Sequence, residues 1–340
     1  MDLYIFPEGA CLNNGYGIGV DFAYRKLQPK KEDLVVWYTI LDKKDMMYLH
    51  DEDVVIRKNS FYSFESVKNI LLGKDRTELS YAALSFLKDY DFDNIHCDEV
   101  IFYRALRKMF PDKKITLRLH NCFARIHDRQ QMLGQKVDWK YMMKLKNMYK
   151  LEKEIFQDKN VFKIFISDED RDYYRSVFGR YNDSETWAYI PDMELAVRNR
   201  RPISFGHKLV WFGGIESHKK ASIDWFITDV FPLIKREITD VEFHLWGRCS
   251  QVYNDEDNKV FGHGFFCGKG MPLPDSLYIN PDIIGGGIKL KLQTLTESGV
   301  PFISSVFGYE GYSKDLIDNK YVIVKELDDW VGSIVDLIKC

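Results

Sequence analysis

The sequence lacks the features that mark several large classes of protein. Its six cysteines are scattered and form no CxxC pair, which argues against a zinc ribbon and a disulfide framework. No apolar run approaches the roughly 20 residues that a membrane-spanning helix needs. The first residues, MDLYIFPEG, have no basic segment before a long apolar core, so we expect no signal peptide. These absences favour a cytoplasmic protein with at most peripheral contact with the inner face of the cell membrane.

The sequence also lacks a dominant sign of charge. The net charge is −3 over 340 residues, so nothing in the overall charge points to a nucleic-acid partner. Hydrophobic residues make up 45% of the chain and charged residues 29%, which is typical of a soluble globular protein. The length is too great for one ordinary core and suits two domains.

Strand-like and helix-like segments alternate along the whole chain. The apolar runs 34–39 and 208–212 are typical of buried parallel strands, and 138–156 has the 3.6-residue period of a long helix. A polar, proline-broken stretch, 181–206, separates two such arrays. We therefore predict an α/β protein with two Rossmann-like, doubly wound parallel-sheet domains that face a central cleft. The expected boundaries are 1–190 for the first domain, 191–206 for a linker and 207–340 for the second domain.

A glycine-rich turn, Gly285–Gly287, lies between a predicted strand and a predicted helix that carries Lys289 and Lys291 near its start. The alternative is a tight turn whose glycines only permit close packing. Lysine near the start of a helix is unfavourable for the helix dipole unless an anion is present, and this favours a phosphate site. Residues two apart do not share a helix face, so we expect Lys291 to reach the ligand and Lys289 to be solvated.

Other polar or glycine-bearing turns also follow predicted strands. Gly214 lies in the first turn of the second domain, and Lys219 follows it in a basic loop. Gly15 and Gly17 lie in an N-terminal loop whose GxGxG spacing differs from the dinucleotide fingerprint, so a nicotinamide cofactor is not expected. His120 ends the predicted strand 113–120, at the edge where ligands bind in parallel sheets. A solvated loop and a structural histidine are the alternatives for Lys219 and His120.

The Asp-x-Asp pattern of metal-dependent sugar transferases is present but uninformative. It occurs four times, at residues 51/53, 91/93, 168/170 and 255/257. The third copy is a predicted helix start, where acidic residues are expected in any case. We therefore predict no metal site.

Taken in order, the motifs resemble those of a known family. The second domain contains FGGIESHKK, WFITDVFPLI, LWGR, GGGIKLK, SGVPFIS and GYEG, and the first contains the glycine loop, a strand ending in His-Asn, and EKEIF followed by FISDED. In this order and over most of the chain, the sequence resembles the GT-B-fold retaining glycosyltransferases of bacterial family 4, also called group 1.

The resemblance implies metal-independent transfer of a sugar, with retention, from a nucleotide diphosphate sugar to a glycan or lipid-linked glycan. A UDP- or GDP-sugar is the expected donor, and capsule or O-antigen synthesis is the family's commonest use. The resemblance assigns catalytic roles to His120, Lys291 and Glu310, and it implies that His120 contacts the transferred sugar. The implied donor-binding residues are Gly15, Gly17, Gly214, Lys219, Arg248, Gly286, Gly287, Ile288, Lys289, Thr294 and Gly311.

The chain departs from the family pattern at the usual pair of glutamates, E-x7-E. Gly286 and Thr294 stand at these positions, and Glu297 lies about one helical turn after Thr294. Gly214 stands where the family has an arginine, a charge that Arg248 can replace. The missing glutamates leave open a non-catalytic partner that binds a nucleotide sugar or glycan for another transferase. A GT-B epimerase would need acidic groups beside the sugar, and the sequence does not place them.

Overall fold

The structure is a computed structural model in which two units are defined by their internal contacts. Unit 1 comprises Met1–His127 and Met142–Trp187, and unit 2 comprises Asp128–Tyr141 and Ala188–Cys340. The residues that the structure describes are 1–7, 15–40, 46, 49–58, 63–71, 78–132, 134, 139–181, 184–200, 203, 205–215, 217–266, 271–273, 275–285, 287–318 and 320–339.

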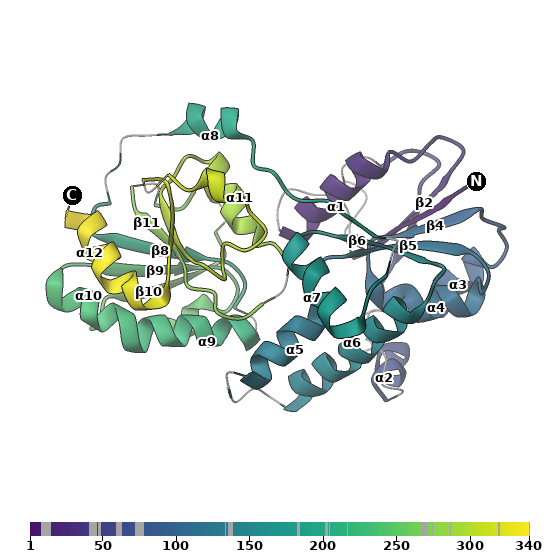
Figure 1. The fold of residues 1–340 in the computed structure, drawn as a ribbon, viewed down its shortest axis with the longest axis horizontal. Coiled ribbons are helices and arrows are strands. Elements are labelled where there is room, and N and C mark those ends of the chain that lie inside the picture. The colour runs from purple at the N-terminus through teal and green to yellow at the C-terminus, as the bar shows by residue number, and fades with distance from the viewer. Residues whose placement is uncertain are drawn as a thin grey trace. The chain divides into compact units, whose positions relative to one another are not determined.

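Unit 1 is built on a seven-stranded, all-parallel sheet with the order β3-β2-β1-β4-β5-β6-β7. Figure 1 labels the strands β2, β4, β5 and β6 of this sheet. Its strands are β1 (Leu3–Phe6), β2 (Leu34–Thr39), β3 (Val54–Arg57), β4 (Asn94–Cys97), β5 (Lys114–Leu119), β6 (Val161–Phe165) and β7 (Ser184–Thr186). The helices are α1 (Gly15–Leu27), α2 (Phe64–Leu71), α3 (Tyr81–Leu87), α4 (Tyr103–Met109), α5 (Phe123–Met132), α6 (Trp139–Gln157) and α7 (Asp168–Phe178), and a 3₁₀ turn (Val100–Phe102) precedes α4.

The apolar runs form buried strands because both faces of this sheet are covered. Alternate residues of a strand point to opposite faces. Leu3 and Ile5 of β1 belong to one core cluster, whereas Tyr4 and Phe6 belong to another that contains Val20 of α1. A strand in this position needs apolar residues on both sides, which explains why the sequence shows continuous runs and not alternation.

Unit 2 contains a six-stranded, all-parallel sheet with the order β10-β9-β8-β11-β12-β13. Its strands are β8 (Lys208–Phe212), β9 (Glu242–Trp246), β10 (Val260–Gly264), β11 (Leu277–Asn280), β12 (Phe302–Ser305) and β13 (Val322–Lys325). The helices are α8 (Met193–Asn199), α9 (Ser217–Trp225), α10 (Phe231–Glu237), α11 (Leu290–Glu297) and α12 (Trp330–Lys339). A π-helical segment (Phe226–Val230) joins α9 to α10, and 3₁₀ turns occupy Ser250–Tyr253, Lys314–Leu316 and Leu327–Asp329.

The strand order of each sheet reverses direction at one place. In unit 2 the chain runs outward from β8 through β9 to β10, then returns to β11 on the other side of β8. In unit 1 the same reversal lies between β1 and β4. Ligands of open parallel sheets bind beyond the carboxyl ends of the strands at such switch points. The prediction of two doubly wound parallel sheets is confirmed.

The stretch expected to be an irregular linker contains regular structure. Strand β7 and helix α8 both lie within 181–206, and α8 belongs to unit 2. The Asp192 side chain caps α8 by accepting from the Leu195 amide at 2.9 Å, while Glu297 of α11 accepts from the Asp192 amide at 3.0 Å. Asn199 donates to the Glu297 carbonyl at 2.8 Å. Contacts with a distant helix stabilise α8, and local sequence does not reveal such contacts.

Candidate functional site

In unit 2 the turns after β8 and β9 lie against each other, next to the switch point between β8 and β11. The Gly213 amide donates to the Trp246 carbonyl at 3.0 Å, and the Ile215 amide donates to the Arg248 carbonyl at 3.3 Å. Gly247 has a φ of +129°, and a Cβ at this position would lie 2.0 Å from the Gly213 carbonyl oxygen. Only glycine permits this backbone approach. The exposed Arg248 side chain follows directly, and Gly214 has open space where a Cβ would project.

Lys291, in the first turn of α11, has a buried ammonium group that lies close to Trp211 of β8 and to Asp282. Its Nζ lies 3.5 Å from Asp282 Oδ2, and the two side chains are 14% and 1% exposed. The same nitrogen lies 5.2 Å from the centroid of the Trp211 ring. Burial lowers the pKa of Lys291 to about 8; Lys219 and Lys289 lower it as well, whereas Asp282 opposes the shift. Three cations therefore converge where the sequence predicted a phosphate site.

The glycine-rich turn leads into α11 with Lys289 folded back over it. Gly285 and Gly287 have φ values of +155° and +68°. Lys289 Nζ donates to the Gly287 carbonyl at 3.0 Å and lies 4.7 Å from the centroid of the Phe307 ring. The prediction that Lys289 is solvated is therefore wrong, because a backbone carbonyl of the turn accepts a hydrogen bond from its ammonium group. Ile288 is buried, and Gly286 lies outside the described residues.

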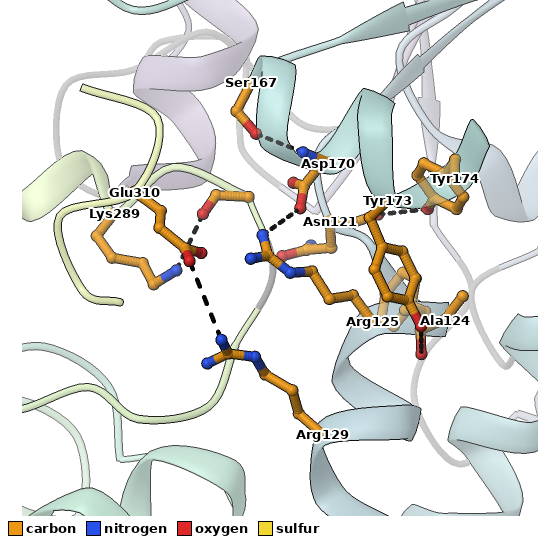
Figure 2. Close-up of polar contacts among 12 residues, drawn as sticks. Asn121, Ala124, Arg125, Arg129, Ser167, Asp170, Tyr173, Tyr174, Lys289 and Glu310 are labelled. Atoms are coloured by element: carbon orange, nitrogen blue, oxygen red, sulfur yellow. Dashed lines mark hydrogen bonds and ion pairs between the residues drawn. The ribbon is translucent and has the colours of Figure 1, made fainter. Parts of the chain in front are cut away.

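Glu310 and Gly311 lie in the turn region after β12, beside an arginine that the sequence analysis missed (Figure 2). Arg129 Nη2 lies 4.0 Å from Glu310 Oε1. The Arg129 guanidinium stacks 3.7 Å from the centroid of the Phe307 ring and donates to the Ile283 carbonyl at 3.1 Å. No local motif marks Arg129, since its partners lie more than 150 residues away in the chain.

Thr294 and Glu297, the residues near the family's second glutamate position, are engaged within unit 2. Thr294 Oγ1 donates to the Leu290 carbonyl at 3.4 Å. The Glu297 carboxylate accepts from the Asp192 amide and, at 2.8 Å, from Gln293 Nε2. This use of Glu297 in holding α8 weighs against its replacing the missing glutamate.

In unit 1 a buried charge cluster surrounds His120, which follows β5 as predicted. His120 Nε2 lies 2.7 Å from the Asp98 carbonyl oxygen and 3.1 Å from Asp98 Oδ2. Arg118 Nη1 donates to Asp98 Oδ1 and to the Gly19 carbonyl, both at 2.8 Å. Burial favours a raised pKa for Asp98, but Arg118 and His120 outweigh it and hold the pKa below its usual value. The carboxylate thus stays ionised and orients the His120 ring.

The remaining residues of the predicted site in unit 1 are Gly15 and Gly17, which occupy the first turn of α1. The loop before them, 8–14, lies outside the described residues. Asp98 directly follows β4, so its place at a strand's carboxyl end was a signal that sequence reasoning could have used.

The Asp-x-Asp copy at 168/170 forms the start of α7, as predicted. The Ser167 side chain accepts from the Asp170 amide, and Asp170 Oδ1 pairs with Arg125 Nη1 at 3.1 Å (Figure 2). Across the described residues, no three His, Cys, Asp or Glu side chains gather as metal ligands. In the same part of the chain, no helix is long and apolar enough to cross a membrane.

Comparison with known proteins adds evidence on the fold. No protein-family model matches the chain, and no curated protein matches it significantly. Among solved structures, WaaG, a glycosyltransferase involved in lipopolysaccharide biosynthesis, is 11% identical with a TM-score of 0.62; the match covers 100% of this chain and 91% of that one. TarM is 12% identical with a TM-score of 0.64, over 99% of this chain and 91% of that one.

A third similar structure is that of HepE from Anabaena, solved in complex with UDP and glucose. It is 12% identical with a TM-score of 0.57, and the match covers 100% of this chain and 89% of that one. At these identities the likeness concerns the fold. Two all-parallel, doubly wound sheets joined in this order, and matched over the whole chain, show that the protein has the GT-B fold of glycosyltransferases.

Proposed function

We propose that this protein is a glycosyltransferase that moves a sugar from a nucleotide diphosphate sugar to a glycan or lipid-linked glycan. The observation that carries the proposal is the buried Lys291 ammonium, with Lys219 and Lys289 close enough to lower its pKa. Asp282 offsets one of these three positive charges, and the positive charge that remains favours the binding of a further anion. A diphosphate at the switch point of the sheet supplies that anion.

The chemistry needs a stabilised leaving group. The three lysines and the amino-terminal end of α11 offset the charge that develops on the departing diphosphate, so the transfer requires no metal ion. The acceptor hydroxyl attacks from the leaving-group side, its oxygen forms the new bond to the anomeric carbon, and the departing phosphate takes its proton. The sugar configuration is then retained. His120, oriented by Asp98, contacts the transferred sugar, and Glu310 lies near the sugar or the ribose.

The proposed donor is a UDP- or GDP-sugar, and the proposed setting is bacterial surface polysaccharide synthesis, such as capsule or O-antigen, in the cytoplasm. The complex of HepE with UDP and the role of WaaG in lipopolysaccharide biosynthesis support this choice. The proposed ligands of the donor are the residues named above at the turns after β8, β9, β11 and β12.

A thermal-shift screen with UDP, GDP, ADP, CMP and dTDP tests the donor site. A nucleotide at 100 times its dissociation constant adds about 2.7 kcal/mol of stability. We expect one of these nucleotides to raise the melting temperature. In Lys291→Ala, both this thermal shift and sugar transfer should be lost. Lys220→Ala is the matched control, because Lys220 is an exposed neighbour paired with Asp224. If none of the five nucleotides raised the melting temperature, the proposal would be contradicted.

Removing Lys291 alone takes away an ion-pair partner of the buried Asp282 carboxylate, which by itself costs stability. The double variant Lys291→Met/Asp282→Asn removes both charges and separates loss of binding from loss of fold. A double variant that folds and still binds the nucleotide at the parental affinity would show that Lys291 is not a phosphate ligand.

The second candidate function is a non-catalytic partner of another transferase. The observation in its favour is the absence of carboxylates at positions 286 and 294. Donor hydrolysis or sugar transfer by the purified chain separates the two functions. Nucleotide binding without turnover of any donor would favour the partner.

A further inference from the structure

Unit 1 contains a cavity of about 410 Å³ at the amino-terminal edge of its sheet. The cavity lies between the turn that joins α1 to β2 and the turn that precedes β3, and these strands are parallel neighbours. Charged or titratable residues of the two turns line it, namely Lys30, Lys31, Asp33, His50, Glu52 and Asp53. His120 follows β5 and so lies at the opposite, carboxyl edge of the same sheet. The cavity is therefore separate from the cluster around His120.

The two turns bring opposite charges to this cavity. Lys30 and Lys31 of the first turn are exposed, and so is Glu52 of the second turn. Within the described part of the chain, none of these three side chains forms a hydrogen bond or an ion pair. The cavity thus presents two ammonium groups from one turn and a carboxylate from the other, and these charges do not pair with each other.

The other two carboxylates of the cavity already have partners. Asp33 accepts hydrogen bonds from two backbone amides, both at 2.9 Å, and these bonds close the first turn. Asp53 Oδ2 accepts from Trp37 Nε1 at 2.8 Å and from a backbone amide at 3.2 Å. These contacts fix the two turns. The groups that remain for a ligand are the two ammonium groups of the first turn and the Glu52 carboxylate.

Tyr24 and Val35 give the cavity an apolar wall. The Tyr24 ring stacks on Trp37 with 5.5 Å between centroids, and its hydroxyl lies 3.2 Å from His50 Nε2. The ring is therefore held between α1 and the turn before β3. Such a wall removes the C–H face of a sugar ring from water, and the volume lies within the range of small-molecule sites, about 300–1,000 Å³.

We propose that this cavity binds a sugar-sized zwitterion, an amino sugar phosphate, with the phosphate on Lys30 and Lys31 and the ammonium group on Glu52. A simple anion would meet the carboxylates of the second turn, and a simple cation would meet the lysines. A molecule that carries both charges at opposite ends is attracted by both turns. The inference does not depend on the donor site, so a failed nucleotide screen leaves it standing.

Isothermal titration of the full chain with glucosamine 6-phosphate tests the proposal. Glucose 6-phosphate lacks the amine and glucosamine lacks the phosphate, so we expect each analogue to bind at least about tenfold more weakly. A salt concentration of about 0.15 M screens the charges that lie outside the cavity.

Variants of the two turns separate the two charges. Lys30→Gln/Lys31→Gln should weaken binding of glucosamine 6-phosphate at least about tenfold and remove its advantage over glucosamine. Glu52→Gln should also weaken binding, but it should remove the advantage over glucose 6-phosphate. The matched control is Lys146→Gln/Lys150→Gln, which removes the same charge at two exposed lysines of the same unit. The control should bind within about twofold of the parent.

A phosphate can also bind to the donor-site lysines of unit 2, so a further variant is needed. Lys291→Met/Asp282→Asn should leave the affinity for glucosamine 6-phosphate unchanged. Circular dichroism and the melting temperature establish that each variant is folded. The proposal is overturned if the chain does not bind glucosamine 6-phosphate at millimolar concentration, if either analogue binds as tightly, if both lysine pairs weaken binding equally, or if the donor-site variant abolishes it.

Discussion

At the residue scale, Lys291 shows how burial turns a common side chain into a tuned binding group. Its position near the start of a helix was visible in the sequence, whereas its burial beside Asp282 and Trp211 was not. Removing an ammonium from water disfavours its charged form. A bound phosphate compensates for that loss, so ligand affinity and protonation of Lys291 are linked.

This linkage predicts a pH dependence of nucleotide binding. With the pKa of Lys291 at about 8, we expect the affinity to be highest below pH 8 and to fall as the lysine loses its proton above it, by up to about tenfold per pH unit. Isothermal titration on either side of pH 8 measures the effect. The double variant Lys291→Met/Asp282→Asn should bind the nucleotide weakly, with an affinity that does not change with pH. If the affinity of the parental protein did not change with pH either, the role of Lys291 as a phosphate ligand would be refuted.

Protein stability should move in the opposite direction over the same range. The unfolded chain keeps the Lys291 proton up to the ordinary lysine pKa of 10.5, while the folded chain releases it near 8. Between these values the unfolded state binds more protons, so the contribution of Lys291 to the free energy of unfolding rises with pH. Opposite trends in affinity and stability would be specific to a buried lysine.

At the element scale, the start of α5 depends on a carboxyl group from α6. Glu152 accepts from the Phe123 and Ala124 amides at 2.9 and 2.7 Å and from the Tyr174 hydroxyl at 2.6 Å. These amides are among those that a helix start leaves without partners of its own. Burial raises the pKa of Glu152 to about 8, even though the hydrogen bonds act in the other direction.

Replacing Glu152 should therefore change how stability depends on pH. The raised pKa stabilises the fold fully below the ordinary value of 4.5, and this contribution is lost as pH rises toward 8. We expect Glu152→Gln to flatten that slope, by on the order of 5 kcal/mol across the window. Urea unfolding at several pH values measures it. Glu154→Gln, an exposed control on the same helix, should show the same change of unfolding free energy with pH as the parent. If the parent, Glu152→Gln and Glu154→Gln all showed equal slopes, the raised pKa assigned to Glu152 would be contradicted.

At the scale of the whole molecule, each unit has its own sheet and its own core. Leu117 of β5 belongs to the core of unit 1, and Ile303 of β12 belongs to that of unit 2. The donor-site lysines all lie in unit 2. Two cores in one chain need not unfold together, and a ligand held by one unit stabilises that unit first.

Calorimetry should then show two transitions, of which the nucleotide raises the one that belongs to unit 2. Leu117→Ala and Ile303→Ala both truncate side chains that are 0% exposed, and each should cost its own unit about 2–5 kcal/mol. We expect Ile303→Ala to lower the transition that the nucleotide raises, and Leu117→Ala to lower the other. A single transition that both variants shift equally would show that the units unfold as one.

The sequence by itself determined the parallel sheets and the carboxyl-end positions of His120 and the glycine-rich turn, because apolar runs, helical periods and glycine turns are local properties. Only the tertiary structure decided that Lys291 is buried, that Lys289 folds back on its turn, and that Glu297 holds α8. It also brought Asp98 to His120 and Arg129 to Glu310. Burial and pairing depend on which distant segments pack together, and no local pattern of residues records that.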